Sequence, residues 1–228
     1  MLMFLLRLIS QIVVLIGISS AYAGTYDAFF KAVELDDSRA VIRLLQRGFD
    51  VNSPAYDGQS PLAMAIRLDS HRVANVLLRV PGLEIDQANA QGETALMYAA
   101  VKGSLEWAQR LVRQGAQVRR VAGWTPLHYA ASGPEPGVVG FLLDAGAEVD
   151  AVAPDGSTPL MLAARYGDER IVDLLIYRGA DPRLKNPHGA AAVEYARVAG
   201  RDRLAARLAN LAGAAAPQAT PSFSETSR

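Results

Sequence analysis

The sequence predicts an all-α solenoid of about six helix–turn–helix repeats, joined by β-turn loops that we call fingers. One motif recurs along the chain, most clearly as Thr158-Pro159-Leu160-Met161-Leu162-Ala163-Ala164 and as Thr125-Pro126-Leu127-His128-Tyr129-Ala130-Ala131. Its copies start near residues 27, 60, 94, 125, 158 and 191, so the successive steps are 33, 34, 31, 33 and 33 residues. Because a constant period of this length is typical of stacked helical repeats, it decides the fold class.

Each position of the repeat has a physical role. Thr or Ser caps a helix N-terminus, and Pro follows at the first helical position, where a missing N–H costs nothing. Leu and Ala then form an apolar stripe at helical spacing. Gly103 and Gly167 mark the turn into a second helix, and Gly146 and Gly179 follow that helix, where a left-handed cap favours glycine. Asp155-Gly156 and its equivalents predict a tight turn at each finger tip.

This pattern resembles the ankyrin repeat in period and in signature, over residues 25 to about 212. The resemblance implies a non-catalytic scaffold that binds a protein on the concave side, formed by finger tips and the exposed edge of each first helix. Each predicted helix has only two to three turns, too short to be stable alone. Stability must therefore come from stacking on neighbouring repeats.

The end copies depart from the motif. The first has Asp27-Ala28 and the last has Ala191-Ala192 in place of Thr-Pro, as expected of terminal caps. We expect the arginines of the last copy to form a solvated outer face; these are Arg201, Arg203 and Arg207.

The fourth repeat is also irregular. The loop from Gly115 to Thr125 is two residues shorter than its equivalents, which predicts a blunt finger. Gly133-Pro134-Glu135-Pro136-Gly137 falls between the two helices of this repeat. We expect these prolines to shorten or kink both helix ends.

Residues 1–23 are predicted to be a signal peptide. Arg7 precedes an apolar run from Leu8 to Ile18, and Ala21-Tyr22-Ala23 provides a small-x-small cleavage site before Gly24. The alternative is a retained membrane anchor, because the longer run from Leu2 to Ala23 is nearly long enough to span a bilayer. The repeat domain then covers residues 24–213, and the Pro-, Ser-, Thr- and Ala-rich tail, 214–228, is expected to be disordered.

Composition argues against several functions. Lys+Arg and Asp+Glu each number 23, which is unlike a nucleic-acid binder, and the absence of cysteine excludes thiolate chemistry and disulfides. The chain contains no HExxH, P-loop, GxGxxG or GxSxG motif. His71, His128 and His188 lie in different repeats, and the resemblance implies a structural role for His128 in the loop framework. We therefore expect no enzyme activity, small-molecule substrate, cofactor or metal.

Partner-binding candidates follow from the register of the resemblance. They lie at finger tips or on the exposed edge of a first helix, and Tyr, Trp and Arg are enriched among binding hot spots. Trp124 is the main candidate, although an aromatic residue there could simply pack along the finger. The full set is Tyr56, Gln59, Arg67, Gln91, Glu93, Lys102, Trp124, Arg165 and Tyr166.

The predicted function is that of a scaffold protein, which is secreted across the inner membrane and binds a partner protein in the periplasm. The excess of arginine over lysine, 20 to 3, with abundant Ala and Gly, suggests a bacterial source. By analogy with exported ankyrin proteins, the partner could be an oxidative-stress enzyme such as a catalase. Two alternatives remain open: an immunity protein that neutralises a toxin, and a membrane-anchored structural protein that retains residues 2–23.

Overall fold

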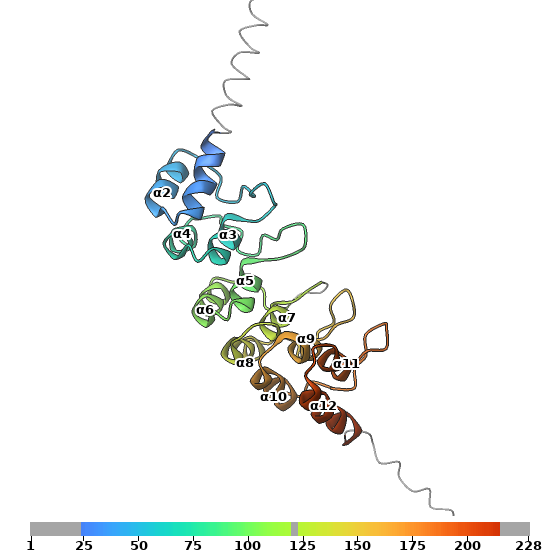
Figure 1. Ribbon diagram of the computed structural model, residues 1–228. Coiled ribbons are helices and arrows are strands. Elements are labelled where there is room, and N and C mark those ends of the chain that lie inside the picture. Colours follow the sequence, from blue (N-terminus) through green and yellow to red (C-terminus); the bar gives the residue numbers. More distant parts are fainter. Residues whose placement is uncertain (1–23, 120–122, 215–228) are drawn as a thin grey trace, which may run out of the picture.

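The computed structural model describes residues 24–119 and 123–214, which fold into paired helices with no β-strand in these ranges (Figure 1). The first pair is a helix over residues 24–34 and α2 (Ser38–Gln46). The architecture confirms the predicted all-α solenoid. The remaining pairs are α3 (Pro61–Arg67) and α4 (His71–Leu77), α5 (Ala95–Val101) and α6 (Leu105–Arg113), α7 (Pro126–Ala131) and α8 (Pro136–Asp144), α9 (Pro159–Tyr166) and α10 (Glu169–Tyr177), α11 (Ala192–Val198) and α12 (Asp202–Ala214).

Capping side chains explain where three of the first helices, α3, α7 and α9, begin. The hydroxyl of Ser60 accepts a hydrogen bond from the amide of Ala63 at 3.1 Å, and Pro61 occupies the first helical position. Thr125 and Thr158 cap α7 and α9 in the same way, again followed by Pro. Each cap satisfies an amide that has no partner within the helix.

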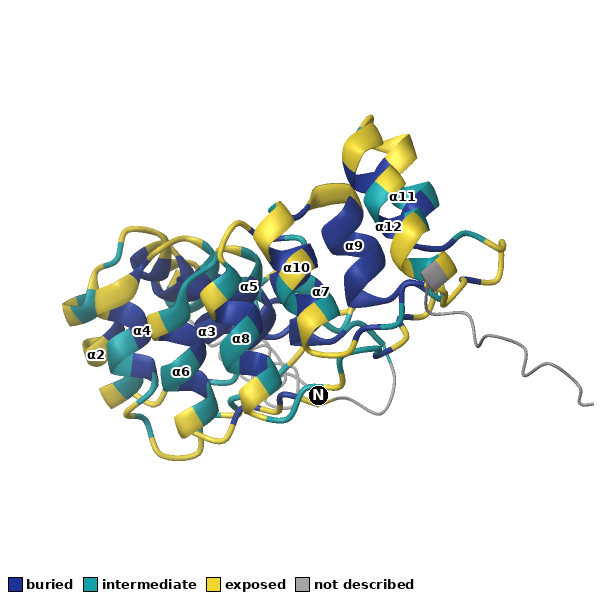
Figure 2. Cartoon of the chain, turned by 90° about the horizontal axis from the view of Figure 1, so that it is seen from below, coloured by how far each residue is buried: buried dark blue, intermediate teal, exposed yellow. Residues whose placement is uncertain are grey.

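The helices form two layers. The first helices α3, α5, α7, α9 and α11 stack on one another on the finger side, and the second helices stack behind them on the outer side (Figures 1 and 2). Leucines of the recurring motif fill the space between the layers, and Leu62, Leu127 and Leu160 are fully buried. Ala99 and Ala163 are also buried, and their small side chains let neighbouring helices approach closely.

The fingers are short hairpin-like loops with a tight turn at the tip. In the finger before α9, the amide of Ala153 donates to the carbonyl of Ser157 at 2.9 Å, and the amide of Gly156 donates back to Ala153 at 2.8 Å. Gly156 has a φ of +79°, and a Cβ there would lie 2.2 Å from Cδ of Pro187 in the next finger. Adjacent fingers therefore pack so closely that only glycine fits this turn.

The fourth repeat bears out only part of its predicted irregularity. Helix α7 has six residues and ends at Ala131, before the Pro-rich turn, whereas α8 keeps nine. Helix α8 is not shortened because Pro136 occupies its first position and Glu135 caps it by accepting a hydrogen bond from Gly137 at 2.9 Å. The predicted blunt finger includes residues 120–122, which lie outside the described residues.

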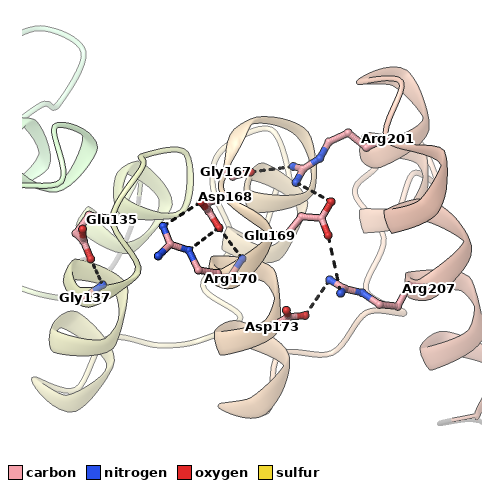
Figure 3. A network of polar contacts seen from close by, with 9 residues as sticks. All are labelled: Glu135, Gly137, Gly167, Asp168, Glu169, Arg170, Asp173, Arg201 and Arg207. Carbon is pink, nitrogen blue, oxygen red and sulfur yellow. Dashed lines mark hydrogen bonds and ion pairs between the residues drawn. The ribbon is translucent and has the colours of Figure 1, made fainter.

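The expectation of a solvated arginine face in the last repeat is wrong for Arg201 and Arg207. Arg201 points back into the preceding repeat and donates to the carbonyls of Ala163, Ala164 and Gly167 at 2.9–3.1 Å. Figure 3 shows the contact with Gly167. Arg207 pairs with Asp173 on α10 at 2.8 Å. Both side chains therefore join two repeats: Arg201 reaches carbonyls at the end of α9, and Arg207 reaches the carboxylate of Asp173 on α10. Arg203 is exposed as expected.

The first repeat closes the other end with aromatic side chains. Phe29 is fully buried and stacks on Phe49, with ring centroids 4.1 Å apart, while Phe30 meets Phe29 edge-on. The predicted signal peptide (1–23), and all but residue 214 of the predicted tail (214–228), lie outside the described residues. Within residues 24–119 and 123–214, no helix combines the length and apolar character needed to cross a bilayer.

Candidate partner-binding surface

Several predicted residues meet in a hydrogen-bonded cluster on the concave side, here named the Glu93 network. The phenol of Tyr98 donates to Oε2 of Glu93 at 2.6 Å, and Tyr129 of the next repeat donates to Oε1 at 2.8 Å. Gln59, from the preceding repeat, donates to the oxygen of Tyr98 and accepts from Nε of Arg67, both at 2.9 Å. The network thus joins three successive repeats.

The carboxylate of Glu93 is stabilised by hydrogen bonds from within the protein. Burial by itself would raise the pKa of Glu93, but hydrogen bonds from Tyr98, Asn89 and Tyr129 together lower it. Burial and the neighbouring Glu93 carboxylate raise the pKa of Tyr98 to about 12. Glu93 is therefore an anion and Tyr98 a neutral donor at neutral pH. Little of their hydrogen-bonding capacity is left for a partner.

An apolar groove lies beside this network, across the third, fourth and fifth repeats. Its volume is about 280 Å³, and we name it the Trp124 groove. Two of its residues, Trp124 and Tyr166, were predicted partner-binding candidates. Its lining is Val101, Trp124, His128, Tyr129, Ser132, Leu162 and Tyr166.

The repeat register explains why these side chains converge. Tyr129 and Leu162 lie four residues after the capping residues Thr125 and Thr158, while Val101 and Ser132 lie seven residues after theirs. Residues separated by three or four positions share one face of a helix. The stacked first helices therefore present the same face, and its large apolar residues form one surface.

Trp124 is held by the buried histidine behind it. Its ring meets His128 edge-on, with centroids 5.4 Å apart. His128 is fully buried, and its Nδ1 lies 2.8 Å from Oγ1 of Thr125 while its Nε2 lies 3.1 Å from the carbonyl of Ser157 in the next finger. These contacts confirm the structural role predicted for His128. Burial lowers its pKa, which keeps the ring neutral.

Arg165 and Tyr166 form the exposed rim of the groove. Tyr166 is 60% exposed, and the guanidinium carbon of Arg165 lies 5.0 Å from the centre of its ring. An aromatic ring beside a cation at the edge of an apolar groove is a common hot-spot arrangement.

Tyr56, Gln91 and Lys102 lie elsewhere on the concave side, whereas Gln59 belongs to the Glu93 network. Tyr56 is 82% exposed at its finger tip and donates to Asp27 at 2.9 Å, and Gln91 is exposed at the next tip. Lys102 pairs with Asp69 at 2.6 Å, which ties the third repeat to the second. Gln59 is only 8% exposed, so its side chain serves the stack and little of it is accessible.

Val101, Tyr129, Ser132 and Leu162 were missed from the sequence. The sequence does carry a signal for two of them, because the residue four positions after the start of each repeat motif is large. These residues are Met64, Tyr98, Tyr129, Leu162 and Tyr195. Treating every copy in the same register would have found Tyr129 and Leu162. Val101 and Ser132 carry no signal of their own, since their residue types are ordinary on any helix.

The described residues contain no group of three or more His, Cys, Asp or Glu side chains arranged to hold a metal ion. His128 lies in the core of the fourth repeat. His71 lies on α4, where its Nδ1 accepts a hydrogen bond from the buried indole of Trp107 at 2.8 Å. These histidines therefore serve packing within and between repeats.

Several known proteins are similar in sequence to part of this chain. The chain is 37% identical over 81 residues to protein phosphatase 1 regulatory subunit 27 of Mus musculus, a match that covers 35% of this chain and 53% of that one. It is also 37% identical over 128 residues to neurogenic locus notch homolog protein 1 of Mus musculus, covering 54% of this chain and 5% of that protein. The chain thus spans about half the length of the phosphatase subunit and a small part of the Notch protein.

A solved structure gives a longer match. It holds the Bd0816 predatory endopeptidase from Bdellovibrio bacteriovorus in complex with immunity protein Bd3460, and the matched chain has a TM-score of 0.69 and 28% identity. The match covers 80% of this chain and 97% of that one. The family model for ankyrin repeats (three copies) matches residues 29–122, 77–153, 114–186 and 137–214, which together cover nearly all of the described residues. The chain belongs to the ankyrin-repeat family.

Proposed function

We propose that this chain is a non-catalytic scaffold that binds a partner protein on its concave face, with an apolar side chain of the partner seated in the Trp124 groove. The observation that carries the proposal is the contrast between this groove and the Glu93 network beside it. The network uses its polar groups internally, whereas the groove presents Trp124, Tyr129 and Tyr166 around an apolar floor. Burial of this apolar floor against a partner removes it from water, which lowers the free energy of the complex.

Site-specific photo-crosslinking tests the proposal. A photoreactive phenylalanine analogue replaces Tyr166 or, as a matched control, Tyr177, which is 83% exposed on the outer helix α10. We expect a crosslinked partner from position 166 and not from position 177. The partner identified in this way is then titrated against Trp124→Ala, which should weaken binding by about 2 kcal/mol. Crosslinks from position 177 alone, or unchanged binding by Trp124→Ala, would contradict the proposal.

A more specific version is that the partner is a toxin and the chain an immunity protein. Its support is the similarity to a solved complex that contains an immunity protein. The rival version, a scaffold for an oxidative-stress enzyme such as a catalase, has no comparable support. Co-expression with the product of an adjacent gene separates them: protection from a lethal product favours the toxin, and higher activity of a co-purified catalase favours the enzyme.

We also propose that the protein acts in the periplasm after removal of residues 1–23. The support is the apolar run from Leu8 to Ile18 followed by Ala21-Tyr22-Ala23. Mass spectrometry of the protein recovered from cells tests this. A mature chain that begins at Gly24 supports export with cleavage, and a chain that retains residues 2–23 in the membrane fraction supports the anchored alternative.

A further inference from the structure

A second groove lies on the outer side of the stack, between α4 and α6. Its volume is about 450 Å³, larger than that of the Trp124 groove, and no function considered so far uses it. We name it the outer arginine groove. It is lined by Asn75, Leu78, Arg79, Glu106, Arg110, Arg113 and Gln114. We propose that this groove binds an acidic segment of a partner protein, with carboxylates placed between the arginine side chains.

The three arginines of the groove are not equivalent. Arg110 is held by the protein: it donates to Asn75, lies 3.5 Å from Glu106, and its guanidinium carbon lies 4.3 Å from the centre of the Trp107 ring. Arg79 is exposed, and Arg113 donates only through Nε to the carbonyl of Gln109 at 3.2 Å. Within the described part of the chain, neither Arg79 nor Arg113 forms an ion pair. Their remaining N–H donors are therefore available to a ligand.

The groove lies within a wider excess of positive charge. Over the second helices of the first three repeats and the residue or two that follow each (38–47, 71–79 and 105–114), there are seven arginines and one acidic residue. The same stretches of the last three repeats (136–145, 169–178 and 202–213) hold four arginines and four acidic residues. One of the seven, Arg72, pairs at 3.0 Å with Asp36, which lies just outside these stretches. The remaining charge excess is local to one end of the outer face, although the whole chain is formally neutral.

The lining favours a protein carboxylate over other anions. Planar guanidinium groups bind carboxylates through paired hydrogen bonds, and Asn75 and Gln114 add neutral donors at the edge. Leu78 is the one apolar residue of the lining, which leaves little for a lipid surface to bury. The lining offers no aromatic ring on which a nucleic-acid base could stack. An acidic peptide segment meets all of these conditions.

Fluorescence anisotropy tests the proposal with the full chain. The probe is a labelled glutamate-rich peptide, and the comparison is a glutamine-rich peptide of the same length. We expect only the glutamate peptide to bind, with an affinity that falls as salt is added. The variant Arg79→Ala/Arg113→Ala should weaken binding roughly tenfold. A matched control, Arg170→Ala/Arg203→Ala, removes the same charge from exposed positions on α10 and α12 and should change binding little.

The outcomes divide clearly. Equal binding of the two peptides, or equal loss in the two double variants, overturns the proposal. So does binding to vesicles that contain phosphatidylglycerol in the absence of binding to the glutamate peptide. Circular dichroism shows whether each variant is folded; if Arg79→Ala/Arg113→Ala is not, Arg79→Gln alone replaces it and should weaken binding measurably. Trp124→Ala should leave binding of the peptide unchanged, so that failure of this proposal and failure of the concave-face proposal remain separate.

Discussion

The outer helices of the first three repeats and those of the last three both carry arginine, but they surround it differently. In the last repeats, Arg178 pairs with Asp144 at 2.8 Å and Arg207 pairs with Asp173 at 2.8 Å, each across a repeat boundary (the second pair in Figure 3). In the first repeats, Arg79 and Arg113 form no ion pair within the described residues. Arginines join neighbouring repeats at both ends, since Arg72 pairs with Asp36 at 3.0 Å in the first repeats. Arg79 and Arg113 differ because they offer free donors at the first end.

The largest expected effect concerns Arg201, the arginine most deeply set into the last repeats. Replacing it by Ala removes the guanidinium donor from the carbonyls of Ala164 and Gly167, while the carbonyl of Ala163 keeps the amide of Gly167. We therefore expect a loss of about 2 kcal/mol in the free energy of unfolding. Urea unfolding followed by circular dichroism measures this. Arg203→Ala, at an exposed position on α12, is the control and should cost little; equal costs would contradict this reading of the last repeats.

A second prediction concerns the junction between the two halves, where His128 joins the fourth repeat to the next finger. Because burial lowers the pKa of His128 from 6.5, the unfolded chain takes up a proton before the folded one does. Stability is therefore greatest above pH 6.5 and falls as the pH drops from there toward the lowered pKa. Hydrogen exchange should show protection lost first in α7 and α9, and the loss should be smaller in His128→Gln.

A smaller effect is expected for the pair Arg207–Asp173. Both side chains are partly exposed, at 41% and 60%, so solvent screens the interaction. We expect a double-mutant cycle with Arg207→Ala and Asp173→Ala to give a coupling energy of about 0.5 kcal/mol at low salt, and less as salt is added. A coupling that does not respond to salt would show that the pair acts through packing instead.

The smallest effect on stability is expected for Arg79→Ala/Arg113→Ala. Neither arginine makes an ion pair within the described residues, and the change relieves repulsion among the neighbouring arginines, so the free energy of unfolding should change by less than about 0.5 kcal/mol. The same urea titration measures it. A loss as large as that of Arg201→Ala would mean that the two ends of the outer face use arginine alike.

Much of the fold could be predicted because its signals are local. A capping hydroxyl, a proline at the first helical position and a glycine after the second helix act within a few residues, and they located α3, α7 and α9 correctly. The shortened α7 was predictable for the same reason. The unshortened α8 was missed because Pro136 was treated as a helix breaker when it stands at the position that tolerates it.

The surface was less predictable because it depends on contacts between repeats. Gln59 was expected at the surface, but Tyr98 of the next repeat covers it. Arg201 and Arg207 were expected in solvent, but acids and carbonyls of the preceding repeat bind them. No single copy of the motif contains both members of such a pair. Trp124 and Tyr166 were placed on the concave side by register and remain predicted partner contacts.

The Glu93 network also has a mechanical consequence. The carboxylate of Glu93 accepts one hydrogen bond from a tyrosine of its own repeat and one from a tyrosine of the next repeat. Gln59 of the preceding repeat is hydrogen-bonded to the first of these tyrosines. Bending that spreads the third and fourth repeats apart must stretch the hydrogen bond from Tyr129 to the ionised Glu93, and bending that spreads the second and third must stretch the bond from Gln59 to Tyr98. The array therefore resists such bending more strongly there than apolar stacking alone would allow. Tyr129, which belongs to both the network and the Trp124 groove, gives the groove a fixed curvature before a partner arrives.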